Sequence, residues 1–415
     1  MRHAEPAAGR RWPHGVEVKV WHHYFGSEYG PEEVQAILAA LQQEHLTNGP
    51  QTVAFEEEFA AFCGTPHAVA TSNCTTALRL AAQLCGLGPG DEVITTPLTF
   101  IATSQAVLAC GATPVFADVD PRTFNLDPAS VAACITPRTR AIFLTHLFGQ
   151  CCEMDPIDAV AREHGLHVVE DAANAIGAAY RGRRAGSLGD VAAFSFHSSK
   201  NMTTLGEGGM LTTRHQAWAS KARLLRTIGV SYADGIERPD PLDYWLPLPY
   251  EADDPDGYLP NNYRMHECQA AVGRAQLRKV ERLNERRRQI AHRYTEAIRE
   301  IPGLTPPYEH PDCTHVYYLY TVLVDPARAG FTRDDLMRVL FREFGVHTIT
   351  GYPPSYWLRI YRKRGYARGL CPAAERAYAQ MITLPIHPRL TDEEIAYVTA
   401  SVGRAAARLA GRRGP

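Results

Sequence analysis

Lys200 and Asp171 are the two residues whose types and positions fit a specific chemistry. Lys200 follows an apolar run that begins at residue 191 and precedes a Gly-rich turn, and Asp171 ends the apolar run "VVED". A lysine amine can form an imine with the aldehyde of pyridoxal phosphate (PLP), and a buried carboxylate can keep the cofactor's pyridine nitrogen protonated. The other four lysines lie in polar or basic stretches. Position alone still leaves a structural lysine about as frequent an outcome as a catalytic one.

The segment "TSNCTTALRL" offers a place for the cofactor's phosphate. The pattern predicts a strand that ends at Ser72 and a helix that starts near Thr75, so that free backbone N–H groups and the positive end of the helix dipole face outward. Taken alone, the segment is more often a plain capped helix with Asn73 or Thr75 as its N-cap. Other segments must therefore support the phosphate site.

Two further side chains are weaker candidates. Ser195 lies on the expected strand that leads to Lys200, where its hydroxyl could bind a phosphate oxygen. Phe100 ends the run "TTPLTF" and could stack on a pyridine ring, although a core phenylalanine is the more frequent outcome.

Short apolar runs alternate with helical patterns from residue 67 onward. The apolar runs cover residues 67–73, 91–97, 113–120, 140–149 and 166–172, and the expected helices span 75–86, 101–110, 127–134 and 155–164. This alternation predicts βαβ units and an α/β fold whose mostly parallel sheet is covered on both faces. Ligands of such sheets lie at the carboxyl ends of the strands, where Asp171, Lys200 and the turn after Ser72 are expected.

The chain is expected to divide into a leader (1–30), a large domain (31–275) and a smaller C-terminal α+β domain (276–415). A long helix is predicted over 265–298, with one apolar stripe and with the charges of "ERRR" (285–288) on a solvated face. A strand at 316–324, a helix at 332–344 and helices from Pro372 and Thr391 follow. The stretch 229–261, rich in Pro, Asp and aromatic residues, breaks the pattern and predicts a long ordered excursion.

Composition sets the broad class. The 415 residues are 45% apolar and 21% charged, which is typical of a globular protein of two or three lobes. A net charge of -2 gives no overall attraction to nucleic acid or to an anionic membrane. The N-terminus lacks the apolar core of a signal peptide, and we expect a cytoplasmic protein. Neither the ten scattered cysteines nor the seventeen histidines show the spacing of a metal site, and free thiols are the expected state.

Nine segments, in the same order along the chain, resemble one family. They are "LTNGPQTVAFEEEFAAFCG", "SNCTTAL", "GPGDEVITTPLTFIAT", "GATPVFADVDPRTFNLD", "HLFGQ", "VVEDAANAIGA", "FSFHSSKNMTTLGEGGML", "NNYRMHECQAAVGRAQL" and "YPPSYW". This set resembles the DegT/DnrJ/EryC1/StrS aminotransferases, PLP enzymes that mostly aminate keto sugars. The resemblance implies the fold type I architecture of PLP enzymes and a homodimer with active sites at the subunit interface.

The resemblance assigns roles residue by residue. Lys200 is similar to the lysine that forms the imine, and Asp171 to the partner of the pyridine nitrogen. Phe100 matches the ring that stacks on the cofactor, and Ser195 matches a phosphate contact. One subgroup of the family has His in place of the lysine and deoxygenates instead of aminating, so Lys200 favours the aminotransferase branch.

The resemblance also implies contacts from four other positions. The backbone at Cys74 and Thr75 matches phosphate contacts, and Asn262 resembles an asparagine that reaches the phosphate of the neighbouring subunit. Asn174 stands where Gln or His is more usual as the partner of the cofactor's ring hydroxyl. Cys74 likewise replaces a smaller residue, often Gly.

The expected reaction is a ping-pong transfer. An amino donor, glutamate or glutamine, leaves its amino group on the cofactor as pyridoxamine phosphate, which then aminates a keto sugar, most often nucleotide-linked in this family. Freed Lys200 would move the proton between the substrate carbon and the cofactor carbon. The alternatives are amination of a keto-cyclitol in aminoglycoside-type biosynthesis, a PLP-binding regulator without turnover, and a purely structural protein.

The excursion at 229–261 is longer than the family resemblance leads us to expect. Tyr244, Trp245 or Tyr250 is expected to help close over the acceptor or the dimer interface. The alternative is a surface decoration without a role in the reaction.

Overall fold

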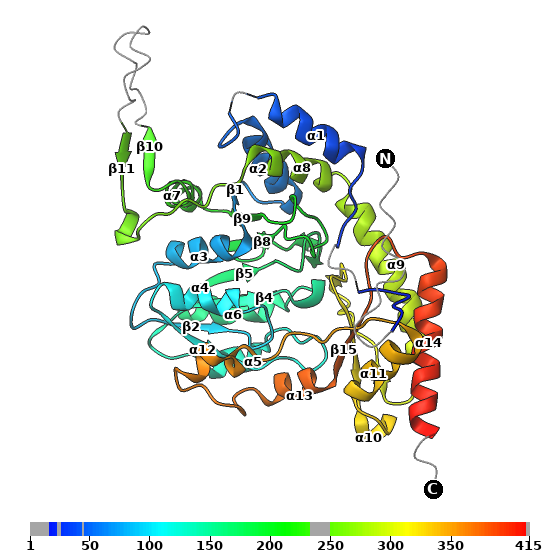
Figure 1. Cartoon of the computed structure of the whole chain (residues 1–415). Helices are drawn as coiled ribbons and strands as arrows, with labels where there is room; N and C mark the ends of the chain where they lie inside the picture. Colours follow the sequence, from blue (N-terminus) through cyan, green and yellow to red (C-terminus); the bar gives the residue numbers. More distant parts are fainter. Residues whose placement is uncertain (1–15, 23–25, 44, 233–249, 412–415) are drawn as a thin grey trace.

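A seven-stranded sheet forms the centre of the larger lobe of the computed structural model, which describes residues 16–22, 26–43, 45–232 and 250–411 (Figure 1). The strand order is β1-β9-β8-β5-β4-β2-β3. The strands are β1 (His67–Thr71), β2 (Glu92–Thr95), β3 (Thr113–Phe116), β4 (Thr139–Thr145), β5 (His167–Asp171), β8 (Val191–Ser195) and β9 (Gly209–Thr213). Only β9 runs antiparallel to its neighbours, so the predicted α/β fold with a mostly parallel sheet is confirmed.

Helices cover both faces of this sheet. One face packs on α3 (Cys74–Leu84), α4 (Ala102–Ala109) and α7 (Gln216–Arg226), and the other packs on α2 (Pro50–Cys63), α5 (Pro128–Ala133), α6 (Met154–His164) and α8 (Glu267–Leu277). Alternate strand residues serve the two faces: Val169 belongs to the α3 cluster and Val168 to the α6 cluster. Asp171 therefore shares the face of Val169, and Glu170 points to the opposite face.

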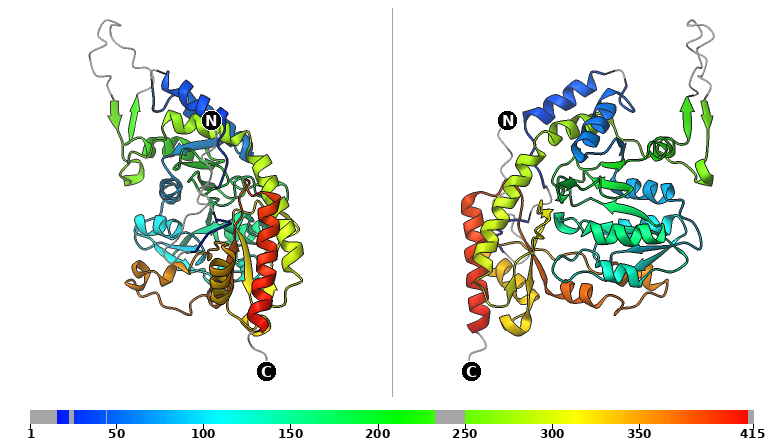
Figure 2. Two further views of the ribbon diagram at one scale, coloured as in Figure 1. Left: turned by 45° about the vertical axis from the view of Figure 1, so that its right-hand side comes forward. Right: turned by 180° about the vertical axis from the view of Figure 1, so that it is seen from behind.

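The smaller lobe is built around α9 (Val280–Ile298). Its apolar cluster also takes side chains from β14 (Tyr320–Val324), β15 (Met381–Leu384), α11 (Arg333–Phe344) and α14 (Asp392–Gly411), and β12 (Leu304–Thr305) and α10 (Pro326–Ala329) complete this lobe. The single helix predicted over 265–298 is interrupted, because Arg278 and Lys279 separate α8 from α9. Figure 2 shows α9 and α14 side by side along the outer edge of the lobe.

The prediction that the arginines of "ERRR" lie on a solvated face is wrong for Arg287. Its side chain is buried, and its two terminal nitrogens donate hydrogen bonds to backbone carbonyls of four residues, Gly26, Tyr317, Tyr318 and Ile386. Arg287 follows Leu283 by four residues and precedes Ile290 by three, so it lies on the apolar stripe itself. It therefore ties α9 to the segments that border the larger lobe.

Residues 355–380 return from the smaller lobe to the larger one. They include η3 (Ser355–Trp357), α12 (Arg359–Arg362) and α13 (Pro372–Gln380). Ser355 N–H donates to Pro97 O, and the Tyr361 hydroxyl donates to Ser104 Oγ in α4. The predicted division of domains at residues 275 and 276 stays a prediction, with this segment crossing between the lobes.

The excursion begins and ends with the two strands of a β-hairpin, which follow α7 and project at the edge of the larger lobe (Figures 1 and 2). Its strands are β10 (Val230–Tyr232) and β11 (Tyr250–Ala252), paired antiparallel and followed by η2 (Pro255–Gly257). Tyr244 and Trp245 lie outside the described residues, and only the backbone of Tyr250 is described. The expectation that these aromatic residues close over the site stays a prediction.

Helix α1 (Pro31–Leu41) packs on α8. The remaining elements are short: η1 (Leu147–Gly149), β6 (Ala179–Tyr180), β7 (Arg183–Arg184) and β13 (Cys313–Thr314). All ten cysteines are free thiols. Within the described ranges, no helix is long and apolar enough to cross a membrane, and no group of three or more His, Cys, Asp or Glu side chains could hold a metal ion.

Candidate active site

Lys200 and Asp171 meet at the carboxyl end of the parallel strands. Asp171 is the last residue of β5 and pairs with Ala193 of β8, two residues before Ser195, where that strand ends. Lys200 follows five residues later and is 8% exposed. The charges of Asp171 and Lys200 both act on the thiol of Cys74 at the start of α3. Three segments distant in sequence therefore converge at one edge of the sheet, as the sequence predicts.

Asp171 is buried and incompletely hydrogen-bonded. Its Oδ2 accepts a hydrogen bond from Thr103 Oγ1 at 2.5 Å, and its Oδ1 accepts one from the Ala173 N–H at 3.1 Å. Burial raises the pKa of the Asp171 carboxyl, against the opposing effects of these two bonds and of nearby Lys200 and His146. Each carboxylate oxygen keeps lone-pair capacity for another donor, such as the N–H of a protonated pyridine ring.

Tyr318 is a functional candidate that the sequence analysis missed. The Lys200 Nζ lies 4.2 Å from the centroid of its ring, and its hydroxyl lies 3.3 Å from Ser199 Oγ. Burial would raise the pKa of the Tyr318 hydroxyl, but the charge of Lys200 and hydrogen bonds with Ser199, Tyr352 and Lys200 lower it overall. Tyr318 lies in "VYYLYTVLV", where the apolar pattern predicted only a strand. The tyrosine holds the amine by contacts of its ring and its hydroxyl.

The turn before α3 has the geometry of an anion site. Asn73 is the N-cap and accepts a hydrogen bond from the Thr76 N–H, so the expected cap is present. In the described part of the chain, no hydrogen bond engages the N–H of Cys74 or of Thr75. A Cβ at Gly209, which pairs with Ser195, would lie 2.4 Å from the Asn73 carbonyl carbon. The end of β8 and the start of α3 are thus held close together, and both can serve one phosphate.

Phe100 and Asn174 also suit a bound ring. The Phe100 side chain is 59% exposed and its ring centroid lies 6.4 Å from that of Tyr352, so the alternative of a core phenylalanine does not apply. Asn174 is buried and interacts with the Tyr352 hydroxyl, but its Oδ1 has no hydrogen-bond partner among the described residues. A buried amide oxygen without a partner is costly unless a ligand supplies the donor.

Asn262 lies at the surface beside the same turn. Its neighbour Tyr263 accepts a hydrogen bond from the Ser72 N–H, and Asn262 itself is exposed and bridges to Thr227. The expected contact of Asn262 with the phosphate of a neighbouring subunit stays a prediction.

These residues fit PLP. Lys200 can hold the aldehyde, Asp171 the ring nitrogen and Asn174 the ring hydroxyl. The N–H groups at the start of α3 and the hydroxyl of Ser195 can hold the phosphate. The donor set and the Asn174 oxygen, which lacks a partner among the described residues, thus fit a bound PLP.

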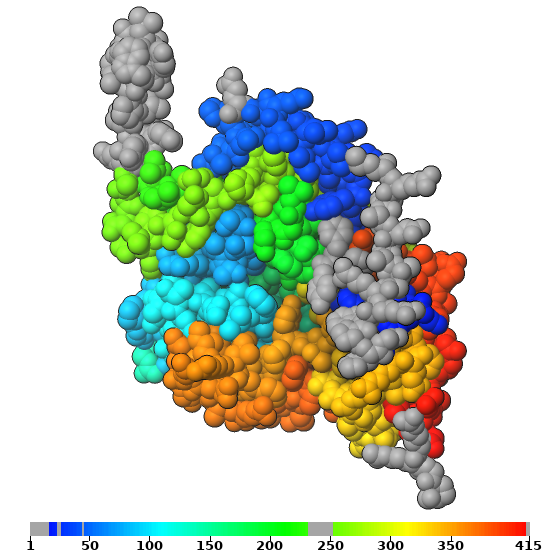
Figure 3. All heavy atoms as spheres, in the orientation of Figure 1, coloured from blue at the N-terminus to red at the C-terminus, as the bar shows by residue number. Residues whose placement is uncertain are grey.

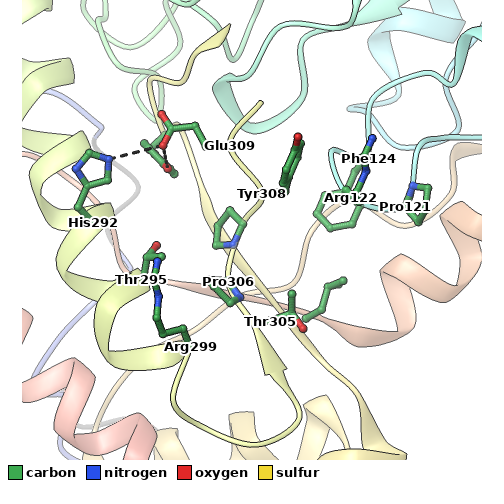
Figure 4. Close-up of a pocket in the computed structure, with 13 residues that line it drawn as sticks. Pro121, Arg122, Phe124, His292, Thr295, Arg299, Thr305, Pro306, Tyr308 and Glu309 are labelled. Atoms are coloured by element: carbon green, nitrogen blue, oxygen red, sulfur yellow. Dashed lines mark hydrogen bonds and ion pairs between the residues drawn. The ribbon is translucent and has the colours of Figure 1, made fainter. Parts of the chain in front are cut away.

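A cavity of about 520 Å³ lies elsewhere, between the two lobes (Figure 4). Arg122 and Tyr308 face each other at one side of it, with the guanidinium carbon 4.8 Å from the ring centroid, and His292 of α9 approaches Glu309 at the other. None of the predicted site residues lines this cavity.

Comparison with known proteins agrees with this geometry. Residues 27–403 match the DegT/DnrJ/EryC1/StrS aminotransferase family. The spore coat polysaccharide biosynthesis protein SpsC of Bacillus subtilis (strain 168) is 43% identical over 374 residues, covering 90% of this chain and 94% of SpsC. GDP-perosamine synthase of Caulobacter vibrioides (strain ATCC 19089 / CIP 103742 / CB 15) is 43% identical over 351 residues, covering 84% of this chain and 88% of that enzyme.

The structural comparison gives the same result. The crystal structure of S. venezuelae DesV in complex with a ketimine intermediate superposes with a TM-score of 0.80 at 37% identity, covering 91% of this chain and 94% of DesV. The larger lobe thus has the fold type I architecture of PLP enzymes. The chain belongs to the DegT/DnrJ/EryC1/StrS family of PLP-dependent aminotransferases.

Proposed function

We propose that this enzyme transfers an amino group from glutamate or glutamine to a keto sugar carried by a nucleotide, in the biosynthesis of an amino sugar. The observation that carries the proposal is the convergence of Lys200, Asp171 and the α3 turn at one edge of the sheet. The acceptor class is supported by the similarity to GDP-perosamine synthase, whose name places a sugar on a nucleoside diphosphate.

The residues of the chain divide the work around the cofactor. When bound, PLP supplies the aldehyde that carries the amino group and the ring that accepts electrons. Asp171 holds a proton on the ring nitrogen by its charge, and the α3 turn binds the phosphate. Lys200 Nζ removes the proton from the substrate carbon and returns it, acting as general base and then as general acid. Tyr318 keeps the Nζ atom in place by its ring and its hydroxyl.

A spectroscopic titration tests the first half of the reaction. We expect the purified enzyme to show the visible absorbance of PLP bound to Lys200, and this band to disappear on addition of L-glutamate or L-glutamine. Lys200→Ala removes the amine, so the variant should bind PLP without the band and without turnover. A band that persists with both donors would contradict the proposed donor, and a wild-type enzyme without any band would contradict the cofactor assignment.

The acceptor is tested on enzyme that has been treated with the donor. A panel of GDP- and dTDP-linked keto sugars, with keto-cyclitols as the second class, is added, and the band of bound PLP is followed. Return of the band with a nucleotide-linked keto sugar supports the proposal. Return with a keto-cyclitol alone would replace the acceptor class, and the absence of return with any compound would contradict both acceptor classes.

We also propose that two copies of the chain form a homodimer that shares its active sites. One face of α1, the loop that follows it and the start of α2 expose apolar side chains that a single chain leaves uncovered: Val34, Leu38, Leu41, Leu46 and Val53. Val34, Leu38 and Leu41 follow the spacing of one helix face. This blue segment forms one end of the molecule in Figure 3. An apolar patch of this kind is typical of a subunit interface.

Mixing two variants tests the sharing. If Asn262 serves the site of the partner subunit, Lys200→Ala and Asn262→Ala each impair both sites of their own homodimer. After unfolding and refolding the two together, one intact site forms in each mixed dimer, and about a quarter of all sites regain activity. Activity that never exceeds the mean of the separate variants would contradict a shared site.

A further inference from the structure

Three buried threonine hydroxyls form a chain that ends on Asp171. Thr145 Oγ1, at the end of β4, lies 3.1 Å from Thr99 Oγ1, and Thr99 Oγ1 lies 3.0 Å from Thr103 Oγ1 in α4. Thr103 Oγ1 lies 2.5 Å from Asp171 Oδ2. All three threonines are at most 3% exposed. The chain thus crosses from β4 through the loop after β2 to the edge of the sheet where Lys200 lies.

The direction of these bonds follows from the acceptor at the end. An ionised carboxylate can only accept, so Thr103 must donate its single proton to Asp171. Thr103 Oγ1 also lies 3.2 Å from Phe100 O, but the charged acceptor makes the stronger bond. Thr103 can then only accept from Thr99, and Thr99 only from Thr145. All three hydroxyl dipoles point toward the carboxylate, and each bond polarises the next.

We propose that Thr103, Thr99 and Thr145 are positioning residues that fix the orientation of Asp171 and favour its ionised form, and that the enzyme depends on the whole chain of hydroxyls. The inference rests on the proposed role of Asp171 as partner of the pyridine nitrogen. The expected order of importance is Thr103, then Thr99, then Thr145, because polarisation weakens along the chain.

The surroundings of Asp171 explain why such support is needed. Burial is the largest influence and raises its pKa, while Lys200 and His146 oppose the rise. The other titratable groups that face it are the thiol of Cys74 and the hydroxyl of Tyr352. Loss of the Thr103 bond removes a group that lowers the pKa, so the carboxyl becomes easier to protonate.

The stability of the apoenzyme gives the first test, because it does not depend on the reaction. A hydroxyl that serves the ionised carboxylate stabilises the fold only where Asp171 is charged. Urea unfolding is measured from below the ordinary Asp pKa of 3.8 up to pH 8. We expect the unfolding free energy of Thr103→Val to be almost that of the wild type at the acidic end. The deficit of the variant relative to the wild type should grow as the pH rises through the pKa of folded Asp171.

Thr95→Val is the matched control. Thr95 is buried on β2 and its hydroxyl donates to the neutral carbonyl of Phe143 at 3.0 Å, so the same change there should cost the same stability at every pH. Thr103→Ser keeps the hydroxyl and should restore the wild-type pH profile. A Thr103→Val profile parallel to that of Thr95→Val would overturn the proposal.

Binding of PLP to the apoenzyme gives the second test. Loss of a bond to a charged group weakens the affinity of Thr103→Val for PLP about 10- to 100-fold. For Thr99→Val, and less for Thr145→Val, we expect roughly a two- to fivefold loss. If Thr103→Val alone changes the affinity and the pH profile, the bond is local and the chain is refuted. A different result would contradict the proposed reaction itself: Lys200→Ala or Asp171→Asn variants that still catalyse transamination.

Discussion

Glu170 and Asp171 are neighbours on β5, and both are buried, yet their carboxylates have opposite surroundings. Glu170 accepts four hydrogen bonds, from the N–H groups of Gly186, Leu188 and Gly189 and from His146 Nε2. The Nδ1 atom of His146 accepts from the Cys152 N–H, which makes Nε2 the donor. Glu170 is therefore saturated by the protein itself.

Asp171 lies on the other face of the strand and, within the described part of the chain, receives only two donors, Thr103 and Ala173. The fold thus leaves this carboxylate with room for a ligand and with a raised pKa. A buried acid whose lone pairs are all used by the chain is part of the structure. One whose lone pairs are only partly used is available for chemistry.

The largest expected effect separates the two acids by activity. Asp171→Asn removes the charge that holds the pyridine proton, and we expect transamination to fall at least about 100-fold. Because burial already disfavours the charged form of Asp171, the apoenzyme should lose little stability at pH 7, within about 1 kcal/mol. Steady-state kinetics and urea unfolding of the same preparation measure both. A variant that loses stability but keeps its activity would show that Asp171 has a structural role like that of Glu170.

Glu170→Gln should show the reverse pattern. The amide replaces one accepting oxygen by a donor, which leaves buried donors of the segment 186–189 or of His146 without a partner. The free energy of unfolding is expected to fall by about 2–5 kcal/mol. If Glu170→Gln is assayed under conditions where it stays folded, its activity per bound PLP should remain within about a factor of three of the wild type. An unchanged unfolding midpoint would contradict the structural role.

The parts of this site that depend on strand order could be predicted from the sequence. The alternation of apolar runs and helices placed the ends of β5 and β8 at one edge, and this alone brings Asp171 near Lys200. The N-cap at Asn73 was predictable because capping is a local preference. Position alone suggested roles for Phe100 and Ser195, and the role of Asn262 came from the family resemblance; all three stay predictions.

Contacts between distant segments could not be read from local patterns. Thr99, Thr103 and Thr145 are unremarkable in sequence, and only the parallel packing of β2, β4 and β5 aligns their hydroxyls. Tyr318 contacts the segment of Ser199 and Lys200 although it lies 119 residues after Ser199. Arg287 differs, because its place between Leu283 and Ile290 on the apolar stripe is visible in the sequence, although the cluster of charges around it predicts a solvated face.

Two buried amides extend the comparison of the two acids and give the smallest expected effect. Asn284 Oδ1 accepts from Asn201 Nδ2 and its Nδ2 donates to Ile176 O, whereas Asn174 Oδ1 has no partner among the described residues. Asn284→Ala should lower the free energy of unfolding of the apoenzyme by about 1–3 kcal/mol and leave the PLP affinity unchanged.

Of the interactions with described residues, Asn174→Ala loses only the one with Tyr352, so its unfolding free energy should fall by less than about 1 kcal/mol. Its affinity for PLP should weaken about three- to tenfold. Asn174→Gln is the informative companion variant, because its longer amide can still reach a ring hydroxyl and should keep most of the affinity. Equilibrium binding of PLP and urea unfolding, run on all three variants, separate the two roles. If Asn174→Ala bound PLP as tightly as the wild type, the Asn174 oxygen would not contribute to PLP binding. A buried acceptor without a partner among the described residues would then not identify a ligand contact in this site.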